Sequence, residues 1–296
     1  MKLMYIDCSM GAAGDMLTAA LLELLDAGER EAFIEEFNSL GLPGIVMETE
    51  PSVKCGVEGT HVHMLVNGAE EDEHMHDHIH AHHHEHHSHE DGHMHDHDHH
   101  HHTHKHDDTA AHTHAHTHDG VPHTHSHNGV AEIRHIVRDH LELPENVRED
   151  ILKVYDIIAD AESKAHGVPI TEVHFHEVGT MDAIADVTAV CLLIDRIKPQ
   201  KIAASPVNVG GGTVKCAHGI LPVPAPATAN ILEGIPSYSG DIKSELCTPT
   251  GAALLRYFAD EFCEMPEMQV ERQGFGMGTK DFERANCVRV TLGETD

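Results

Sequence analysis

The sequence predicts an α+β fold, a mixed sheet with packed helices, interrupted by a disordered His-rich insertion. Alternating and apolar runs typical of strands occur between amphipathic, helix-like segments. These segments follow no regular strand–helix–strand order, so a uniformly parallel sheet is not expected. Between residues 74 and 128 nearly every apolar side chain disappears, and such a segment cannot bury enough surface to fold. We therefore expect one globular domain made of residues 1–73 and 129–296, with 74–128 as a low-complexity insertion.

Before the insertion, a first strand is predicted at residues 3–8, LMYIDC, which are short and apolar as a run. The small-residue turn SMGAAGD follows, and residues 16–28 then have helical periodicity with a glycine at their end. A second helix is predicted at residues 29–40. Residues 45–66 alternate in two runs around glycines, which is typical of a β-hairpin.

After the insertion, two amphipathic helices are predicted at residues 130–143 and 144–167, the second with a proline at its start and a glycine at its end. Residues 170–179 indicate a strand or an extended turn, and residues 180–197 a largely apolar helix. The last third is rich in glycine and proline, with a helix start at TPTGAALL that a threonine can cap. Two strands are predicted near the C-terminus, at residues 268–278 and 287–293.

The composition argues against several classes of partner. A formal net charge of −31 disfavours nucleic acid or an anionic membrane surface. The seven cysteines are odd in number and form no CxxC pair, so a reducing compartment fits better than a disulfide framework. The N-terminus lacks the apolar core of a signal peptide, and no apolar run reaches the roughly 20 residues that span a bilayer. We expect a cytoplasmic protein.

The segment HFHEVGTMDAIAD carries the sharpest group of chemically active residues. His174 and His176 are two apart and would lie on one face of a strand, with Glu177 directly after them. Asp182 and Asp186 are four apart and share a face near the start of the next helix. Two imidazoles and up to three carboxylates could converge there into a divalent-metal or proton-transfer site. The alternative is a surface turn beside a helix, in which the acidic residue of the first turn interacts favourably with the positive end of the helix dipole.

The turn CSMGAAGDM joins a predicted strand to a predicted helix. Its small residues leave backbone N–H groups exposed at the helix N-terminus, where a phosphate could bind. We predict Ser9, Gly11, Gly14 and Asp15 as this phosphate site. Asp15 could instead take a metal or a ribose hydroxyl, or the segment could be a tight turn in which Asp15 caps the helix.

Two further segments suggest metal handling. Cys216 and His218 are two apart, after three glycines and before a stiff proline run, so they could chelate a soft or borderline metal. An ordinary surface loop is the alternative there. Residues 74–127 contain 26 of the 34 histidines, a density that must bind Ni²⁺, Cu²⁺ or Zn²⁺. Because catalysis needs a preorganised shell of ligands, we interpret this tract as a metal store and not as an active site.

With these segments in view, the chain resembles the LarC family of nickel-insertion proteins. The resemblance runs nearly from end to end and includes a histidine-rich insertion at this place. Its motifs are DCSMGAAGDM, AESKAHGVPITEVHFHEVGTMDAIADV, ASPVNVGGG, CAHGILPVPAPATANILEGIP, ELCTPTGAALL and GFGMGTKDF. The turn SMGAAGD departs from the serine- and glycine-rich variant of many relatives. Full-length relatives continue into a further C-terminal domain, whereas this chain stops at Asp296, about where that domain should begin.

The resemblance implies a reaction. Ni²⁺ is inserted into pyridinium-3,5-bisthiocarboxylic acid mononucleotide, in a CTP-dependent, lyase-type step that gives the nickel-pincer cofactor of lactate racemase. CTP, with Mg²⁺ or Mn²⁺, is expected to bind through the absent C-terminal domain, which could be supplied as a separate chain. The product would pass to lactate racemase or to another pincer-dependent enzyme.

On this basis His174, His176 and Glu177 are expected to handle nickel and remove the ring proton, because forming a nickel–carbon bond requires a base beside the metal. Asp182 or Asp186 would either orient those ligands from behind or bind the metal as additional ligands. Cys216 and His218 would relay the metal. Two alternatives are a nickel chaperone or store without catalysis and a metal-dependent hydrolase, although no Ser–His–Asp or HExxH pattern supports the second.

Overall fold

The computed structural model describes residues 1–69, 113–118, 121–126, 129–173, 175, 178–216 and 218–296. The chain divides into two compact units, one made of Met1–Glu71 and His127–Asp296, the other of Asp72–Ser126. In the second unit the described residues form a short antiparallel hairpin, β4 (Thr113–His118) with β5 (Val121–Ser126). The predicted disorder of the rest of the insertion lies outside the described residues.

The first unit is built on a mixed sheet of seven strands, which confirms the predicted α+β class. In spatial order the strands are β11 (Glu261–Phe262), β6 (Lys201–Ala204), β1 (Lys2–Asp7), β13 (Cys287–Glu294), β12 (Gln269–Met277), β3 (Val57–Val66) and β2 (Ile45–Lys54). β1 runs parallel to β6 and antiparallel to β13. β2 and β3 form the predicted hairpin.

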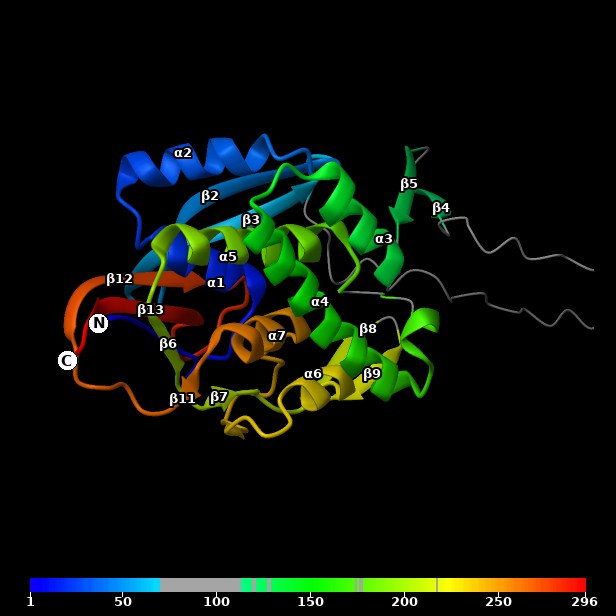
Figure 1. Ribbon diagram of the computed structural model, residues 1–296. Coiled ribbons are helices and arrows are strands. Elements are labelled where there is room, and N and C mark those ends of the chain that lie inside the picture. The colour runs from blue at the N-terminus through cyan, green and yellow to red at the C-terminus, as the bar shows by residue number, and fades with distance from the viewer. Residues whose placement is uncertain (70–112, 119–120, 127–128, 174, 176–177, 217) are drawn as a thin grey trace, which may run out of the picture. The chain divides into compact units, whose positions relative to one another are not determined.

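The helices pack in layers on one face of this sheet (Figure 1). They are α1 (Gly14–Leu22), α2 (Ala27–Asn38), α3 (Val130–His135), α4 (Glu145–His166), α5 (Met181–Ile197), α6 (Pro226–Ile231) and α7 (Pro249–Phe258). α1 contacts β3, β12 and β13, α5 packs on α1, and α4 packs on α5, α6 and α7. A single large hydrophobic cluster fills the space between the sheet and these helices.

Alternation along β1 explains how both of its faces are buried. Met4 and Ile6 point into the large cluster under the helices. Leu3 and Tyr5 point to the opposite face, where they pack with Ala203 and are covered by partly buried side chains of the segment before β12. The first strand was therefore predictable as an apolar run but not as an alternating one.

Local signals placed several helix ends. Gly167 is left-handed, with a φ of 66°, and ends α4 as predicted. The Thr248 hydroxyl accepts a hydrogen bond from the N–H of Gly251 at 3.2 Å and caps α7. The prediction of one helix over residues 16–28 was wrong, because α1 ends at Leu22. Asp26 and Glu29 form a reciprocal capping box that starts α2, and this fixes a new helix where the apolar periodicity appeared to continue.

Residues 170–179, between α4 and α5, were predicted to be a strand or an extended turn, and their described part favours a turn. The first of them, Ile170–Glu172, form a single 3₁₀ turn, and none of the described residues of this segment belongs to a strand. No helix in the described part of the chain is long and apolar enough to cross a membrane.

Helix α1 packs so closely on β12 that the strand has no room for a side chain at the point of contact. A Cβ atom at Gly276 would lie 1.8 Å from the carbonyl oxygen of Met16. Because that oxygen is backbone, the helix must move away as a whole. We expect Gly276→Ala to destabilise the fold by about 3 kcal/mol, which corresponds to a Tm lower by about 6–12 °C.

Thermal unfolding followed by circular dichroism measures this effect. Gly28→Ala is the matched control, since its Cβ would meet only the Asp26 carboxylate oxygen, at 3.7 Å, within α2. Its Tm should stay the same or rise slightly, because alanine favours a helix more than glycine does. An unchanged Tm for Gly276→Ala would contradict the close packing of α1 on β12.

Candidate functional site

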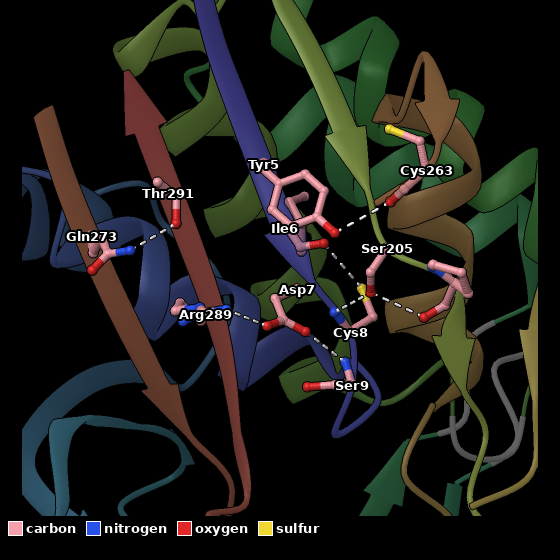
Figure 2. Close-up of polar contacts among 11 residues, drawn as sticks. Tyr5, Ile6, Asp7, Cys8, Ser9, Ser205, Cys263, Gln273, Arg289 and Thr291 are labelled. Atoms are coloured by element: carbon pink, nitrogen blue, oxygen red, sulfur yellow. Dashed lines mark hydrogen bonds and ion pairs between the residues drawn. The ribbon is translucent and has the colours of Figure 1, made fainter. Parts of the chain in front are cut away.

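The turn after β1 is held by the protein's own hydrogen bonds. One oxygen of Asp7 accepts the N–H of Ser9 at 3.0 Å, and the other accepts from the Arg289 guanidinium at 2.7 Å (Figure 2). The N–H of Gly11 donates to the carbonyl of Cys8 at 2.9 Å. The N–H of Ala12 donates to the carbonyl of Leu246 at 3.0 Å.

These bonds bear on the predicted phosphate site. The N–H groups of Ser9 and Gly11 both donate to protein oxygens, so a phosphate would have to displace those bonds. Gly11 has a φ of 83°, and a Cβ there would lie 1.9 Å from the Leu246 carbonyl oxygen. Close packing against residue 246 thus accounts for the glycine. Phosphate binding at Ser9, Gly11, Gly14 and Asp15 stays a prediction.

A carboxylate from another helix occupies the start of α1. Asp186, on α5, packs against Gly14, where an added Cβ would lie 2.6 Å from the Asp186 Cβ. The backbone N–H of Asp15 donates a hydrogen bond to the Asp186 carboxylate. The N-cap residue of α1, Ala13, makes no side-chain hydrogen bond to the helix. The Asp186 carboxylate therefore supplies the hydrogen-bond acceptor for an N–H group at the start of α1.

Three aspartates gather at this point, which we call the aspartate cluster: Asp15, Asp182 and Asp186. Burial raises the pKa of Asp186 well above its ordinary value, and the charges of Asp15 and Asp182 raise it further. Among the described residues only the Asp15 N–H lowers that pKa, and no cationic side chain does so. The buried Oδ1 of Asp186 has no hydrogen-bond partner in the described part of the chain.

A buried tyrosine completes the aspartate cluster from α4. Tyr155 is 2% exposed, and its hydroxyl finds no hydrogen-bond partner among the residues that the structure describes. Burial raises the pKa of this hydroxyl, and the charges of Asp182 and Asp186 raise it as well, so all three groups lie near one another. Packing of α4 on α5 produces this arrangement. The spacing of residues in the sequence gave no signal that Tyr155 or Asp15 would lie beside Asp182 and Asp186.

His174, His176 and Glu177 lie outside the described residues. Phe175, between the two histidines in sequence, is buried, and its ring centre is 6.2 Å from that of Tyr155. No group of three or more His, Cys, Asp and Glu in the described residues is arranged to hold a metal ion. The metal and catalytic roles assigned to His174, His176, Glu177, Asp182 and Asp186 therefore stay predictions.

Cys216 and His218 lie elsewhere, at the hairpin of β8 (Thr213–Cys216) and β9 (Gly219–Pro222). The His218 ring packs against that of His166, at the end of α4, with 4.7 Å between ring centres and the planes tilted by 47°. His166 Nε2 is 3.4 Å from the Glu162 carboxylate. Burial lowers the pKa of His218, and His166 lowers it further. The spacing of Glu162 and His166 on one helix face was visible in the sequence, but their meeting with the hairpin was not.

The structure thus separates two groups that carry predicted residues. Tyr155 and His166 both lie on α4, eleven residues apart, or about 16 Å along the helix axis. Cys216 and His218 consequently do not belong to the aspartate cluster. A role for them in metal binding stays a prediction.

Comparison of the sequence with known proteins places the chain in a family. A family model described as "Nickel insertion protein" matches residues 4–296. Three relatives are named pyridinium-3,5-bisthiocarboxylic acid mononucleotide nickel insertion protein. They come from Clostridium kluyveri (37% identity, 100% of this chain, 63% of the relative), Clostridium acetobutylicum (39%, 100% and 65%) and Desulfitobacterium hafniense DCB-2 (34%, 99% and 59%). The chain spans about six tenths of the length of such relatives. No solved structure matches it.

Proposed function

The chain belongs to the nickel insertion protein family, and on this premise we propose that it inserts Ni²⁺ into pyridinium-3,5-bisthiocarboxylic acid mononucleotide, the compound in the names of its relatives. The product would be the nickel-pincer cofactor of lactate racemase, with nickel bonded to two sulfurs and one ring carbon. Ni²⁺ is a substrate of this lyase-type reaction.

The aspartate cluster is the observation that supports this proposal most directly. Asp182 and Asp186 lie together with Asp15 and the buried Tyr155 hydroxyl, and no described cationic side chain offsets the buried charge of Asp186. A buried carboxylate without a counter-charge requires a proton or a bound cation. We assign Ni²⁺ to Asp182 and Asp186. For Asp15 we favour this cluster over the phosphate turn, because neighbouring carboxylates repel a phosphate.

The catalytic roles follow from residue chemistry. As the nickel–carbon bond forms, the ring C–H bond breaks and its proton must pass to a base. We propose His174 and His176 as imidazole ligands of Ni²⁺ and Glu177 as the base. This assignment rests on their closeness to Asp182 in the sequence and on Phe175, whose ring lies beside that of Tyr155 in the cluster.

Nickel delivery is assigned to other parts of the chain. We propose that the tract at residues 74–127 collects Ni²⁺ and that Cys216 and His218 relay it. The contact of His218 with His166, which has Glu162 beside it, gives that relay a second imidazole and a carboxylate. Such ligands suit borderline divalent ions.

The remaining requirements concern the part of the relatives that this chain does not cover. We propose that CTP, with Mg²⁺ or Mn²⁺, binds a C-terminal domain of the kind that the family resemblance implies. The finished cofactor would then be handed to lactate racemase or to another pincer-dependent enzyme in the cytoplasm.

Reconstitution tests the proposed function. The chain alone should bind nickel but insert it slowly, and adding the C-terminal remainder of the Clostridium kluyveri relative with CTP should restore turnover, measured by the absorption of the product. Omitting CTP is the control. Full activity without that remainder would contradict the need for a second part. Uptake of nickel with no product under any condition would favour a chaperone or store, and hydrolysis of phosphate or amide substrates with Zn²⁺ would favour a hydrolase.

A further inference from the structure

Two histidines face each other at the end of α3, outside both the aspartate cluster and the pair Cys216 and His218. His135 ends α3, and His140 ends the π-helical turn Ile136–His140 that follows. Their Nε2 atoms are 3.1 Å apart, and their ring centres 4.7 Å apart at 85°. The His135 side chain is 52% exposed, so solvent ions reach this pair.

The π-helical turn is what brings the pair together. Residues five apart on an α-helix point about 140° away from each other around the axis, so continued α-helix would have separated the two rings. A π-helical turn closes hydrogen bonds from i to i+5 and places residues at that spacing on one face. Such turns are rare and frequently occur at functional sites.

The distance between the two nitrogens fits a shared metal ion. A late first-row divalent ion binds an imidazole nitrogen at about 2.0–2.1 Å, which places two nitrogens at right angles about 3.0 Å apart. The observed 3.1 Å between the Nε2 atoms therefore allows an ion to enter after a small rotation of the rings.

A carboxylate already orients one of the rings. Asp139 accepts a hydrogen bond from His135 Nδ1 at 2.6 Å. With its proton on Nδ1, His135 presents an unprotonated Nε2, to which His140 Nε2–H donates. Metal binding would move the His140 proton from Nε2 to Nδ1, so both rings stay neutral and no proton is lost. Ligating histidines commonly donate their other N–H to a carboxylate in this way.

We propose that His135 and His140, oriented by Asp139, form a two-imidazole site for Ni²⁺ and similar late first-row ions. This proposal depends on the proposed function only for the choice of Ni²⁺ as the ion that binds. With two protein ligands, the remaining positions are left to water, so the ion exchanges readily. The site belongs to the folded unit and begins eight residues after the last histidine of the tract in the sequence.

Site-resolved labelling tests this site in the full chain, where total nickel binding would be dominated by the tract. Histidines are carbethoxylated with diethylpyrocarbonate, with Ni²⁺ in excess over all 34 imidazoles and no precursor, and each peptide is quantified by mass spectrometry. Ni²⁺ should slow modification of His135 and His140 together, while Mg²⁺, which avoids imidazole, should not.

Single variants decide whether the two rings act together. In His140→Ala, Ni²⁺ should no longer protect His135, and in Asp139→Ala half-protection should need about tenfold more nickel. Circular dichroism verifies that each variant folds. Unprotected His135 in the wild type, or protection of His135 that persists in His140→Ala, would overturn the proposal. Because no precursor is present, this result is independent of whether the chain inserts nickel.

Discussion

An Asp186→Asn variant is expected to insert nickel about 100-fold more slowly than the wild type, or worse, while it folds at least as stably. Asparagine has the same shape and retains an oxygen that can accept the Asp15 N–H, so the start of α1 keeps its cap. What the substitution removes is the capacity to carry a negative charge beside Asp15 and Asp182. The insertion rate is measured at saturating nickel with CTP and the C-terminal part of a relative present.

The matched control is Asp195→Asn, on the same helix α5, where the half-buried residue accepts a hydrogen bond only from the Asn146 amide among the described residues. This variant should insert nickel at the wild-type rate. If Asp186 serves only to cap α1, Asp186→Asn will also be fully active, and the assignment of Ni²⁺ to the aspartate cluster would be wrong.

The pH dependence of stability provides a second readout of the same charge. Since the pKa of Asp186 is raised in the folded state above its ordinary value of 3.8, this residue holds its proton more firmly in the folded than in the unfolded chain between that pH and the raised pKa. Stability should therefore fall as the pH rises from about 4 towards the raised pKa. Urea unfolding of metal-free protein should show a weaker fall for Asp186→Asn.

Deleting residues 74–127 is expected to raise the nickel concentration for half-maximal insertion about tenfold, with the maximal rate unchanged. The segment lies almost wholly within the second compact unit, so its removal should leave the sheet and its helices intact. A linker of equal length without histidine is the control, and it should behave like the deletion. Loss of insertion at every nickel concentration would instead favour the tract as the functional centre and the chain as a store.

Elements made by neighbouring residues were predictable from the sequence. The hairpin of β2 and β3, the end of α4 at Gly167 and the cap of α7 at Thr248 all depend on signals within a few residues. The boundary between α1 and α2 was missed because the apolar periodicity outweighed the capping box at Asp26 and Glu29.

Strand order was not predictable in the same way. β13 lies between β1 and β12, so the last strand of the chain pairs with the first. Such pairings depend on packing between distant segments, and no local pattern encodes them. The glycines of β12 are explained by the close packing of α1 on that strand, which leaves no room for a Cβ atom.

The amino-acid sequence alone predicted a divalent-metal protein, through its tract of histidines and its carboxylates at helical spacing, because those residue types can bind such ions in any fold. Which of these side chains lie close together depends on how the helices pack. Packing of α1, α4 and α5 brings Asp15 and Tyr155 to Asp182 and Asp186, and one π-helical turn joins His135 to His140, because the distance between side chains is set by helix packing and backbone geometry.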